Sequence, residues 1–164
     1  MPNYRYKHAV SLGETSAVGN VYFSRYFEWQ GRCREAFLKA HCPNVVESLL
    51  RQECAFLTTG AHCTYGGEWG FRGFEEAWID MSLLRFRGGR MALGFEFIDA
   101  QRPGVVVAHG EQELCCKQRQ GGLWRPSPFP EELARALMPY AVGPELQSAL
   151  EAAVDFHRSR SEAS

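Results

Sequence analysis

The sequence contains no long hydrophobic run. Its longest uninterrupted aliphatic stretch is residues 105–108, whereas a helix needs about 20 apolar residues to cross a bilayer. Residues 1–11 include Arg5 and Lys7 but no apolar segment of the kind that a secretory signal requires. We therefore expect a cytoplasmic protein with no membrane partner.

An excess of charge of one sign is also missing. The chain has 18 Lys and Arg residues against 19 Asp and Glu residues, and a formal net charge of −1. Proteins that bind nucleic acids usually carry a strongly basic surface, so no nucleic-acid partner is expected. With 164 residues, 45% of them hydrophobic, the chain is long enough for one domain with a sizeable core.

The six cysteines lack the spacing of a metal site or a redox motif. They are residues 33, 42, 54, 63, 115 and 116, and no two of them form a Cys-x-x-Cys pair. In a chain without an export signal, such cysteines are expected to stay reduced and to fill apolar space. The five histidines are not spaced as metal ligands or as partners of a nucleophile, so the sequence predicts no metal site.

The first half of the chain predicts a strand followed by a long helix. Residues 4–11 alternate between apolar and polar side chains, which indicates a half-buried strand. After a loop at residues 12–20, apolar residues recur every three or four positions and predict one buried helix face, with Pro43 just past its end. This face holds Trp29, Cys33, Ala36, Phe37 and Ala40, and the solvated stripe holds Glu28, Arg32, Glu35 and Lys39.

The second half predicts long antiparallel strands. Residues 45–50 are interpreted as a short apolar turn, and strands are expected at residues 53–65, 75–87, 90–100 and 104–118. Turn signals at Gly88-Gly89 and at residues 102–104 make the later strands a meander. Prolines mark a connector at residues 126–130, and helices are expected at 131–140 and 144–158. The predicted class is α+β, with a long sheet curled around the central helix.

Residues 13–38 carry a distinctive motif. They include the sequences G-N-V-Y-F at residues 19–23 and Y-F-E-W-Q-G at residues 26–31, followed by Arg34, Glu35, Phe37 and Leu38. This stretch resembles the loop and helix of hotdog-fold thioesterases of the 4-hydroxybenzoyl-CoA type. It is most similar to thioesterases that release a polyene from iterative enediyne polyketide synthases. The resemblance extends over residues 1–118, and the strand region is compatible with it.

The resemblance implies a fold, an assembly and a substrate. The fold would be a hotdog domain at residues 1–142, followed by a helical extension and polar tail at residues 143–164. The chain would form a homodimer with one continuous sheet, and two dimers would form a homotetramer. The substrate would be a long acyl thioester on the acyl carrier protein of the synthase. No cofactor is implied, because the phosphopantetheine arm enters a cleft between subunits as part of the substrate, with the acyl chain in a channel beside the helix.

The resemblance also indicates which residues act. Many relatives have an acid in the loop before the helix, and enediyne relatives have asparagine there; this chain has Ser16. A serine without a partner base is a poor nucleophile, so Ser16 is expected to hold water or substrate. On the helix, the resemblance implies that Arg34 is the functional residue. It lies about 100° around the helix from Cys33 and can donate to a thioester oxygen.

Other candidate site residues surround these two. Backbone N–H groups at a helix start are unsatisfied donors that can stabilise an oxyanion, and the N–H near Phe23 would offer one. Asn20 and Tyr26 complete the predicted catalytic set. The residues predicted to bind substrate are Gly19, Tyr22, Gln30, Leu38 and Thr59.

Each candidate also has a simpler structural interpretation. Arg34 could pair with Glu35 at the surface or at a dimer interface, and Ser16 could be a turn or N-cap residue. Asn20 could cap the helix, and Tyr26 could pack in the core. The loop at residues 66–73, which contains Trp69, is interpreted as a lid or an interface.

Three functions remain open from the sequence. The first is an acyl-carrier-protein thioesterase of the enediyne type, and the second is a general acyl-CoA thioesterase on the same fold. The third is a non-catalytic protein that binds a nascent polyene. Ser16 in place of an acid or amide favours the third, whereas Arg34 and the glycine-containing loop favour an enzyme.

Overall fold

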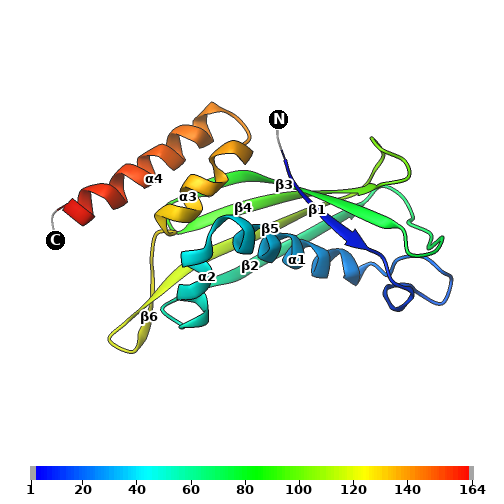
Figure 1. Cartoon of the computed structure of the whole chain (residues 1–164), viewed down its shortest axis with the longest axis horizontal. Coiled ribbons are helices and arrows are strands. Elements are labelled where there is room, and N and C mark those ends of the chain that lie inside the picture. The colour runs from blue at the N-terminus through cyan, green and yellow to red at the C-terminus, as the bar shows by residue number, and fades with distance from the viewer. Residues whose placement is uncertain (1–2, 163–164) are drawn as a thin grey trace.

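A computed structural model describes residues 3–162 (Figure 1). Its main element is a curled antiparallel sheet in the order β1-β3-β4-β5-β2, with β6 paired to β5. The strands are β1 (Tyr4–Ala9), β2 (Cys54–Tyr65), β3 (Glu76–Arg87), β4 (Arg90–Asp99), β5 (Val106–Gln120) and β6 (Leu123–Pro126). The predicted α+β class and the meander of β3, β4 and β5 are confirmed.

The long helix α1 (Ser24–His41) lies against the concave face of this sheet (Figure 1). Three residues of its apolar stripe are buried as predicted, with Trp29, Cys33 and Phe37 no more than 1% exposed. Ala40, in the last turn of α1, was wrongly predicted for this buried face, because it is exposed. The opposite stripe stays in solvent, because its residues are charged. Burying one stripe of a helix beneath a curled sheet gives the domain a single core.

Two short elements correct the sequence-based interpretation. Residues 45–50 belong to a helix, α2 (Pro43–Leu50), and are not a turn. Pro43 ends α1 as predicted, but it also starts α2, because proline is tolerated at the first helical position. The short strand β6 was not predicted; it forms a hairpin with β5 and includes Pro126 at its end.

The loop at residues 66–73 buries its central residue, so the lid or interface interpretation is wrong for Trp69 and stays a prediction for the rest of the loop. Trp69 is 1% exposed and packs edge-on against Trp29 of α1. Its carbonyl accepts a hydrogen bond of 2.8 Å from the Val21 N–H. The Trp69 side chain is therefore part of the core that supports the start of α1, whereas most other residues of this loop are exposed.

The C-terminal elements cover the part of β3 that β1 does not reach. β1 pairs with β3 only as far as Met81, and Ala141 bridges to Leu83 beyond that point. The elements that follow β6 in the chain are α3 (Glu131–Leu137), the 3-10 turn η2 (Met138–Tyr140) and α4 (Pro144–Glu162), and Ala141 lies between η2 and α4. α4 buries Leu150 and Val154.

A buried carboxylate joins β1, the 3-10 turn η1 (Leu12–Glu14) and α1. Glu14 is 7% exposed and accepts hydrogen bonds from His8, Trp29 and the Ser11 N–H, each at 2.8 Å. Burial alone raises the pKa of this carboxyl group, but the hydrogen bonds outweigh burial and hold the pKa below its ordinary value. The loop before α1 is thus tied to the helix that it precedes.

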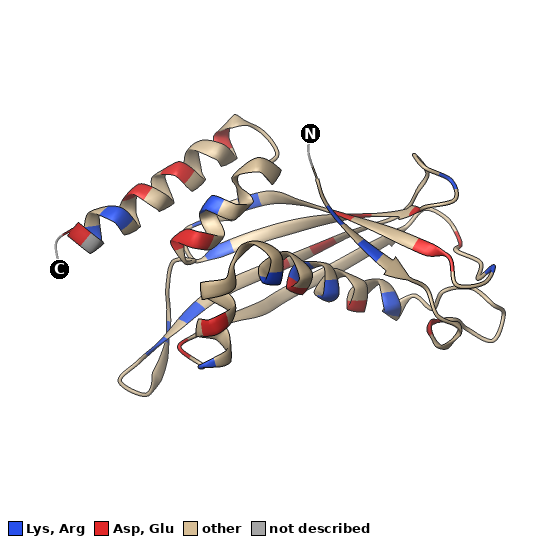
Figure 2. Cartoon of the chain, in the orientation of Figure 1, with Lys and Arg blue, Asp and Glu red and all other residues tan. Residues whose placement is uncertain are grey.

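Acidic and basic residues are interspersed along α1 and α4 (Figure 2). The sheet and helices therefore present mixed charge, as expected from the near-zero net charge. No helix among residues 3–162 is long and apolar enough to cross a membrane.

Candidate active site

Arg34 lies between α1 and the edge of the sheet. Its Nη1 donates to the Thr58 Oγ1 of β2 at 3.2 Å and to the Gln112 Oε1 of β5 at 3.1 Å. Gln112 is 5% exposed, Arg34 is half-buried and Thr58 is exposed. The three side chains therefore form a polar cluster that starts inside the domain and opens at β2, the last strand of the sheet.

The Arg34 guanidinium has only neutral partners. The predicted alternative of an ion pair with Glu35 is wrong, because both hydrogen bonds of Arg34 go to uncharged oxygens. Among the described residues, no carboxylate forms an ion pair with it. Burial lowers the pKa of Arg34 from its ordinary value, and the charge of Glu35 opposes this effect. An arginine stays protonated under these conditions, so a partly desolvated positive charge remains available to an anionic oxygen.

Gln30 precedes Arg34 by one helical turn and is fully buried. Its Nε2 donates to the His62 carbonyl of β2 at 3.2 Å, but its Oε1 has no hydrogen-bond partner among residues 3–162. Space for this side chain exists because residue 110 of β5 is glycine: a Cβ there would lie 2.2 Å from the Gln30 Nε2. The structure thus places an unpartnered acceptor next to Arg34 along the same helix.

The predicted loop residues close a tight turn before α1. The Ser16 N–H donates to the Asn20 carbonyl at 2.7 Å, and the Gly19 N–H donates to the Ser16 carbonyl at 2.9 Å. Gly19 has a φ of +82°, which favours glycine. This geometry agrees with the turn interpretation of Ser16 and leaves its hydroxyl without a recorded partner among the described residues.

Asn20 does not cap α1. The N-cap is Phe23, which has no side-chain hydrogen bond to the helix, and Asn20 Nδ2 donates to Glu68 at 3.0 Å instead. The capping alternative failed because the helix begins at Ser24, four residues after Asn20. Asn20 therefore joins the loop before α1 to the loop at residues 66–73.

The start of α1 is positioned by β2. The Tyr65 hydroxyl donates to the Phe23 carbonyl at 2.9 Å, while no described residue accepts from the Phe23 N–H. Tyr26 is 2% exposed, and its ring contacts those of Tyr65 and Phe97. Burial raises the pKa of Tyr26, and burial with the neighbouring Cys63 raises the pKa of Tyr65 to about 12. Both hydroxyls therefore stay protonated.

The helix start and Arg34 are far apart within one chain. Phe23 and Arg34 are separated by eleven positions, which corresponds to about 16 Å along a helix at 1.5 Å per residue. The free Phe23 N–H and the Arg34 guanidinium of the same chain therefore cannot polarise the same carbonyl group.

The remaining predicted substrate-binding residues lie at different depths. Tyr22 is 46% exposed and Leu38 is buried on α1. Thr59 donates to the Glu113 carbonyl at 3.3 Å, at a β-bulge in β2. The threonine that meets Arg34 is Thr58, one residue earlier. A substrate contact by Tyr22, Leu38 or Thr59 stays a prediction.

The comparisons with known proteins decide the family. Residues 10–137 match the family model described as the thioesterase-like superfamily. The chain belongs to the thioesterase-like superfamily. None of the curated proteins matches it significantly. The crystal structure of the dynemicin thioesterase is similar over 87% of this chain and 99% of that chain, with 38% sequence identity and a TM-score of 0.79.

More distant structures share the fold of this superfamily member. A gentisyl-coenzyme A thioesterase is 22% identical over 81% of this chain and 98% of its own, with a TM-score of 0.66. A 1,4-dihydroxy-2-naphthoyl-CoA thioesterase from Synechocystis is 15% identical over 82% and 95%, with a TM-score of 0.72. The long helix wrapped by the curled sheet is thus a hotdog fold, as the sequence motif predicted, and the reaction class is thioester hydrolysis.

Sequence reasoning missed three residues of this thioesterase-like site: Thr58, Tyr65 and Gln112. A usable signal existed for Gln112, because its alternate neighbours between residues 108 and 116 are small or apolar, namely Ala108, Gly110, Leu114 and Cys116. An amide on an apolar strand face must find a hydrogen-bond partner. No comparable pattern identifies Thr58 or Tyr65, since β2 is largely exposed.

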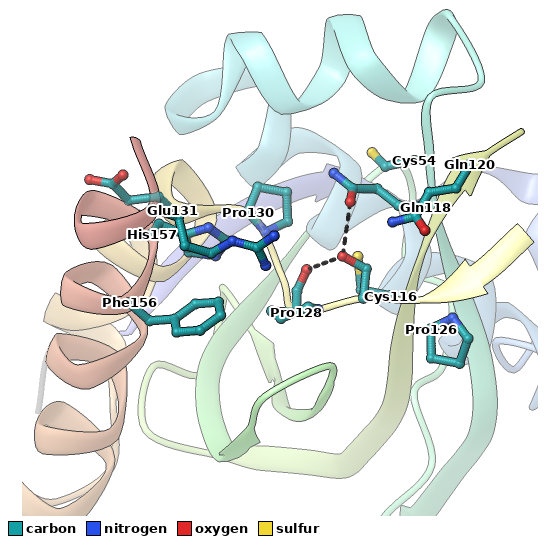
Figure 3. A pocket seen from close by; sticks show the side chains of 12 residues that line it. Cys54, Cys116, Gln118, Gln120, Pro126, Pro128, Pro130, Glu131, Phe156 and His157 are labelled. Atoms are coloured by element: carbon teal, nitrogen blue, oxygen red, sulfur yellow. Dashed lines mark hydrogen bonds between the residues drawn. The ribbon is translucent and has the colours of Figure 1, made fainter. Parts of the chain in front are cut away.

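A cavity of about 660 Å³ lies away from Arg34. In Figure 3, Phe156 and His157 of α4 lie on one side of it, and Cys116 and Gln118 of β5 lie on the other. His157 Nε2 donates to the Phe129 carbonyl at 2.9 Å. Among the described residues no group of three His, Cys, Asp or Glu could hold a metal ion, and all six cysteines are free.

Proposed function

We propose that this protein hydrolyses a long polyene β-ketoacyl thioester carried by the acyl carrier protein of an iterative enediyne polyketide synthase. The observation that carries the proposal is the Arg34 guanidinium, which is partly buried and bonded only to neutral oxygens. Similarity to the dynemicin thioesterase, which was crystallised with a polyene, supports the substrate class. A general acyl-CoA thioesterase and a non-catalytic acyl-binding protein are the alternatives.

The chemistry needs no carboxylate on the enzyme. Arg34 would donate to the thioester carbonyl oxygen and stabilise the negative charge that develops on it as water adds to the carbonyl carbon. The C–S bond then breaks, and the leaving thiolate takes a proton that the attacking water has lost. The products are the β-keto acid and the free thiol of the carrier arm. A β-keto acid loses CO₂ readily, which would leave the polyene ketone.

A homodimer would complete the site. β2 is an edge strand of 12 residues that pairs with β5 on one side only in the described part of the chain, and both Thr58 and Tyr65 lie on it. Pairing of two β2 edges around a two-fold axis would give one continuous sheet and could bring the Phe23 N–H of one copy towards Arg34 of the other. The phosphopantetheine arm would then lie in the cleft between subunits. Two such dimers would form a homotetramer.

The test compares carriers and an arginine variant. Hydrolysis is measured with a β-ketoacyl chain on the acyl carrier protein of the synthase and with the same chain on coenzyme A. We expect kcat/KM to be higher for the carrier protein. Arg34→Ala should lower kcat about a hundredfold or more, the usual effect of removing an oxyanion donor. Arg32→Ala is the control, because Arg32 lies on the exposed stripe of α1.

The outcomes separate the three functions. Equal rates on both carriers would favour a general acyl-CoA thioesterase. Absence of turnover in the parent, or equal turnover in the parent and in Arg34→Ala, would favour the acyl-binding protein. Co-expression with the synthase and identification of the released product would test the polyene directly.

A further inference from the structure

Gln112 occupies an unusual position on β5. It lies on a central strand, opposite Leu93 of β4 and Ala61 of β2, and is 5% exposed. Its neighbours on the inner face are small or apolar, including Gly110 and Leu114. A buried amide at such a place costs free energy unless it is hydrogen-bonded, and the partner recorded for Gln112 is Arg34.

The partner is neutral although the donor is charged. A glutamate at this position would have nearly the same shape and would accept the same hydrogen bond from Arg34. It would also stabilise a buried guanidinium much more than an amide can, because a buried charge without a counter-charge is unfavourable. The neutral residue is therefore the weaker choice for stability alone.

We propose that Gln112 is the positioning residue of Arg34: it orients the guanidinium towards the open side of the cluster without neutralising it, so that the positive charge is reserved for an anionic oxygen of the substrate or the product carboxylate. Thr58 of β2 accepts a hydrogen bond from the same nitrogen, Nη1. With Nη1 held by these two neutral acceptors, the remaining N–H groups are available to a ligand. This inference rests on the proposed thioester hydrolysis and deepens it.

The test uses two variants at residue 112 and one control. Gln112→Glu keeps the shape and the hydrogen bond but supplies a counter-charge, while Gln112→Met keeps the volume and removes the acceptor. Gln118→Glu adds the same charge on the same strand, where the side chain is exposed and bonded to Ser127 instead. Thermal unfolding, kcat and KM on a β-ketoacyl thioester of N-acetylcysteamine are measured for each.

We expect Gln112→Glu to unfold no earlier than the parent and yet to lose about a hundredfold in kcat, because the oxyanion would meet a neutralised donor. KM should change much less. Gln112→Met should lose about tenfold in kcat, since its arginine is charged but poorly oriented. Gln118→Glu should match the parent. Parent-like kcat in Gln112→Glu would overturn the proposal, and if that variant does not fold, parent-like kcat in Gln112→Met would overturn it.

A binding measurement separates this inference from the proposed function. Calorimetry compares octanoate with octanol, which have the same chain and differ in the anionic head. The parent should bind octanoate at least about tenfold more tightly, and Gln112→Glu should lose that preference. If the parent shows this preference but hydrolyses no thioester, the proposed function fails and the role of Gln112 stands. Equal binding of the two ligands by the parent would overturn the role of Gln112.

Discussion

At the scale of single residues, the site depends on one glycine as much as on its polar groups. Gln30 can lie flat against β5 only because Gly110 has no side chain. This contact leaves the Gln30 Oε1 unpartnered inside the domain, one turn before Arg34. A buried acceptor without a partner is costly, and this cost falls one helical turn before the guanidinium that the proposed mechanism uses.

The substitution Gly110→Ala tests this contact. The new Cβ would lie 2.2 Å from the Gln30 Nε2 and 3.2 Å from the Phe97 ring, so one of them must move. We expect the free energy of unfolding to fall by about 1–3 kcal/mol, as for other overpacked cores, measured by urea denaturation. Gly31→Ala is the matched control, because nothing lies near that position and alanine favours a helix. A parent-like Gly110→Ala would contradict the close packing.

At the scale of elements, Glu14 holds three segments together. Its carboxylate joins the end of β1, the η1 turn and α1 through His8, Ser11 and Trp29. The segment from Glu14 to Phe23 carries the predicted loop residues. The Glu14 carboxylate therefore helps to position the start of α1, although it takes no part in the predicted mechanism. The Tyr22 N–H, which donates to the Glu14 carbonyl at 2.9 Å, extends this connection.

Acid should loosen this junction. The pKa of Glu14 in the folded protein lies below its unfolded value. Its contribution to stability is therefore complete above the unfolded pKa, about 4.5, and is lost as the pH falls through the lower, folded pKa. Glu14→Gln should cost about 1–3 kcal/mol at neutral pH and reduce the loss on acidification. Urea denaturation at about pH 7 and about pH 3 measures both quantities.

The acid prediction has a control and a competing group. Glu28→Gln removes an exposed carboxylate that pairs with Arg25 on α1, and its effect should be small. Asp99 is fully buried and its pKa is also lowered: burial raises it, but bonds from Arg102 and Arg72 outweigh burial. Glu14→Gln should therefore keep the share of acid sensitivity that Asp99 contributes. An unchanged acid response in Glu14→Gln would contradict the role of Glu14.

At the scale of the whole molecule, the two edges of the sheet differ in length. One edge is the short strand β1, with the segment before α4 beyond it along β3, whereas the other is the 12-residue β2, which pairs only with β5 within residues 3–162. Long, exposed edge strands readily pair with another chain unless charges or prolines block them, and β2 contains neither. The free edge also borders the Arg34 cluster, so assembly and activity should depend on the same strand.

Charges on β2 should therefore affect both properties. We expect analytical ultracentrifugation of the parent to give at least twice the 18.5 kDa of one chain. The double variant Leu57→Lys/His62→Lys should shift the protein towards the monomer, because like charges would meet across a two-fold axis. Its hydrolysis rate should fall in parallel. Leu50→Lys, on α2, changes a more exposed apolar residue away from this edge and should assemble as the parent does.

The sequence alone determined the class of fold and the buried face of α1. Those features follow from local periodicity: spacings of three and four place Trp29, Cys33 and Phe37 on one side of a helix, and alternation with turn residues defines strands. The motif at residues 13–38 also led to the family. The sequence did not predict α2, because Pro43 was interpreted only as the end of α1, whereas it also starts the next helix.

Only the tertiary structure decided what surrounds Arg34. Its partners come from β2 and β5, distant in sequence, and a strand register shifted by one residue would have turned them to the other face. For the same reason Thr58, rather than the neighbouring Thr59, meets the guanidinium. Local patterns determine which side of an element is buried, but pairing across the sheet decides which buried groups meet, because that pairing depends on the whole chain.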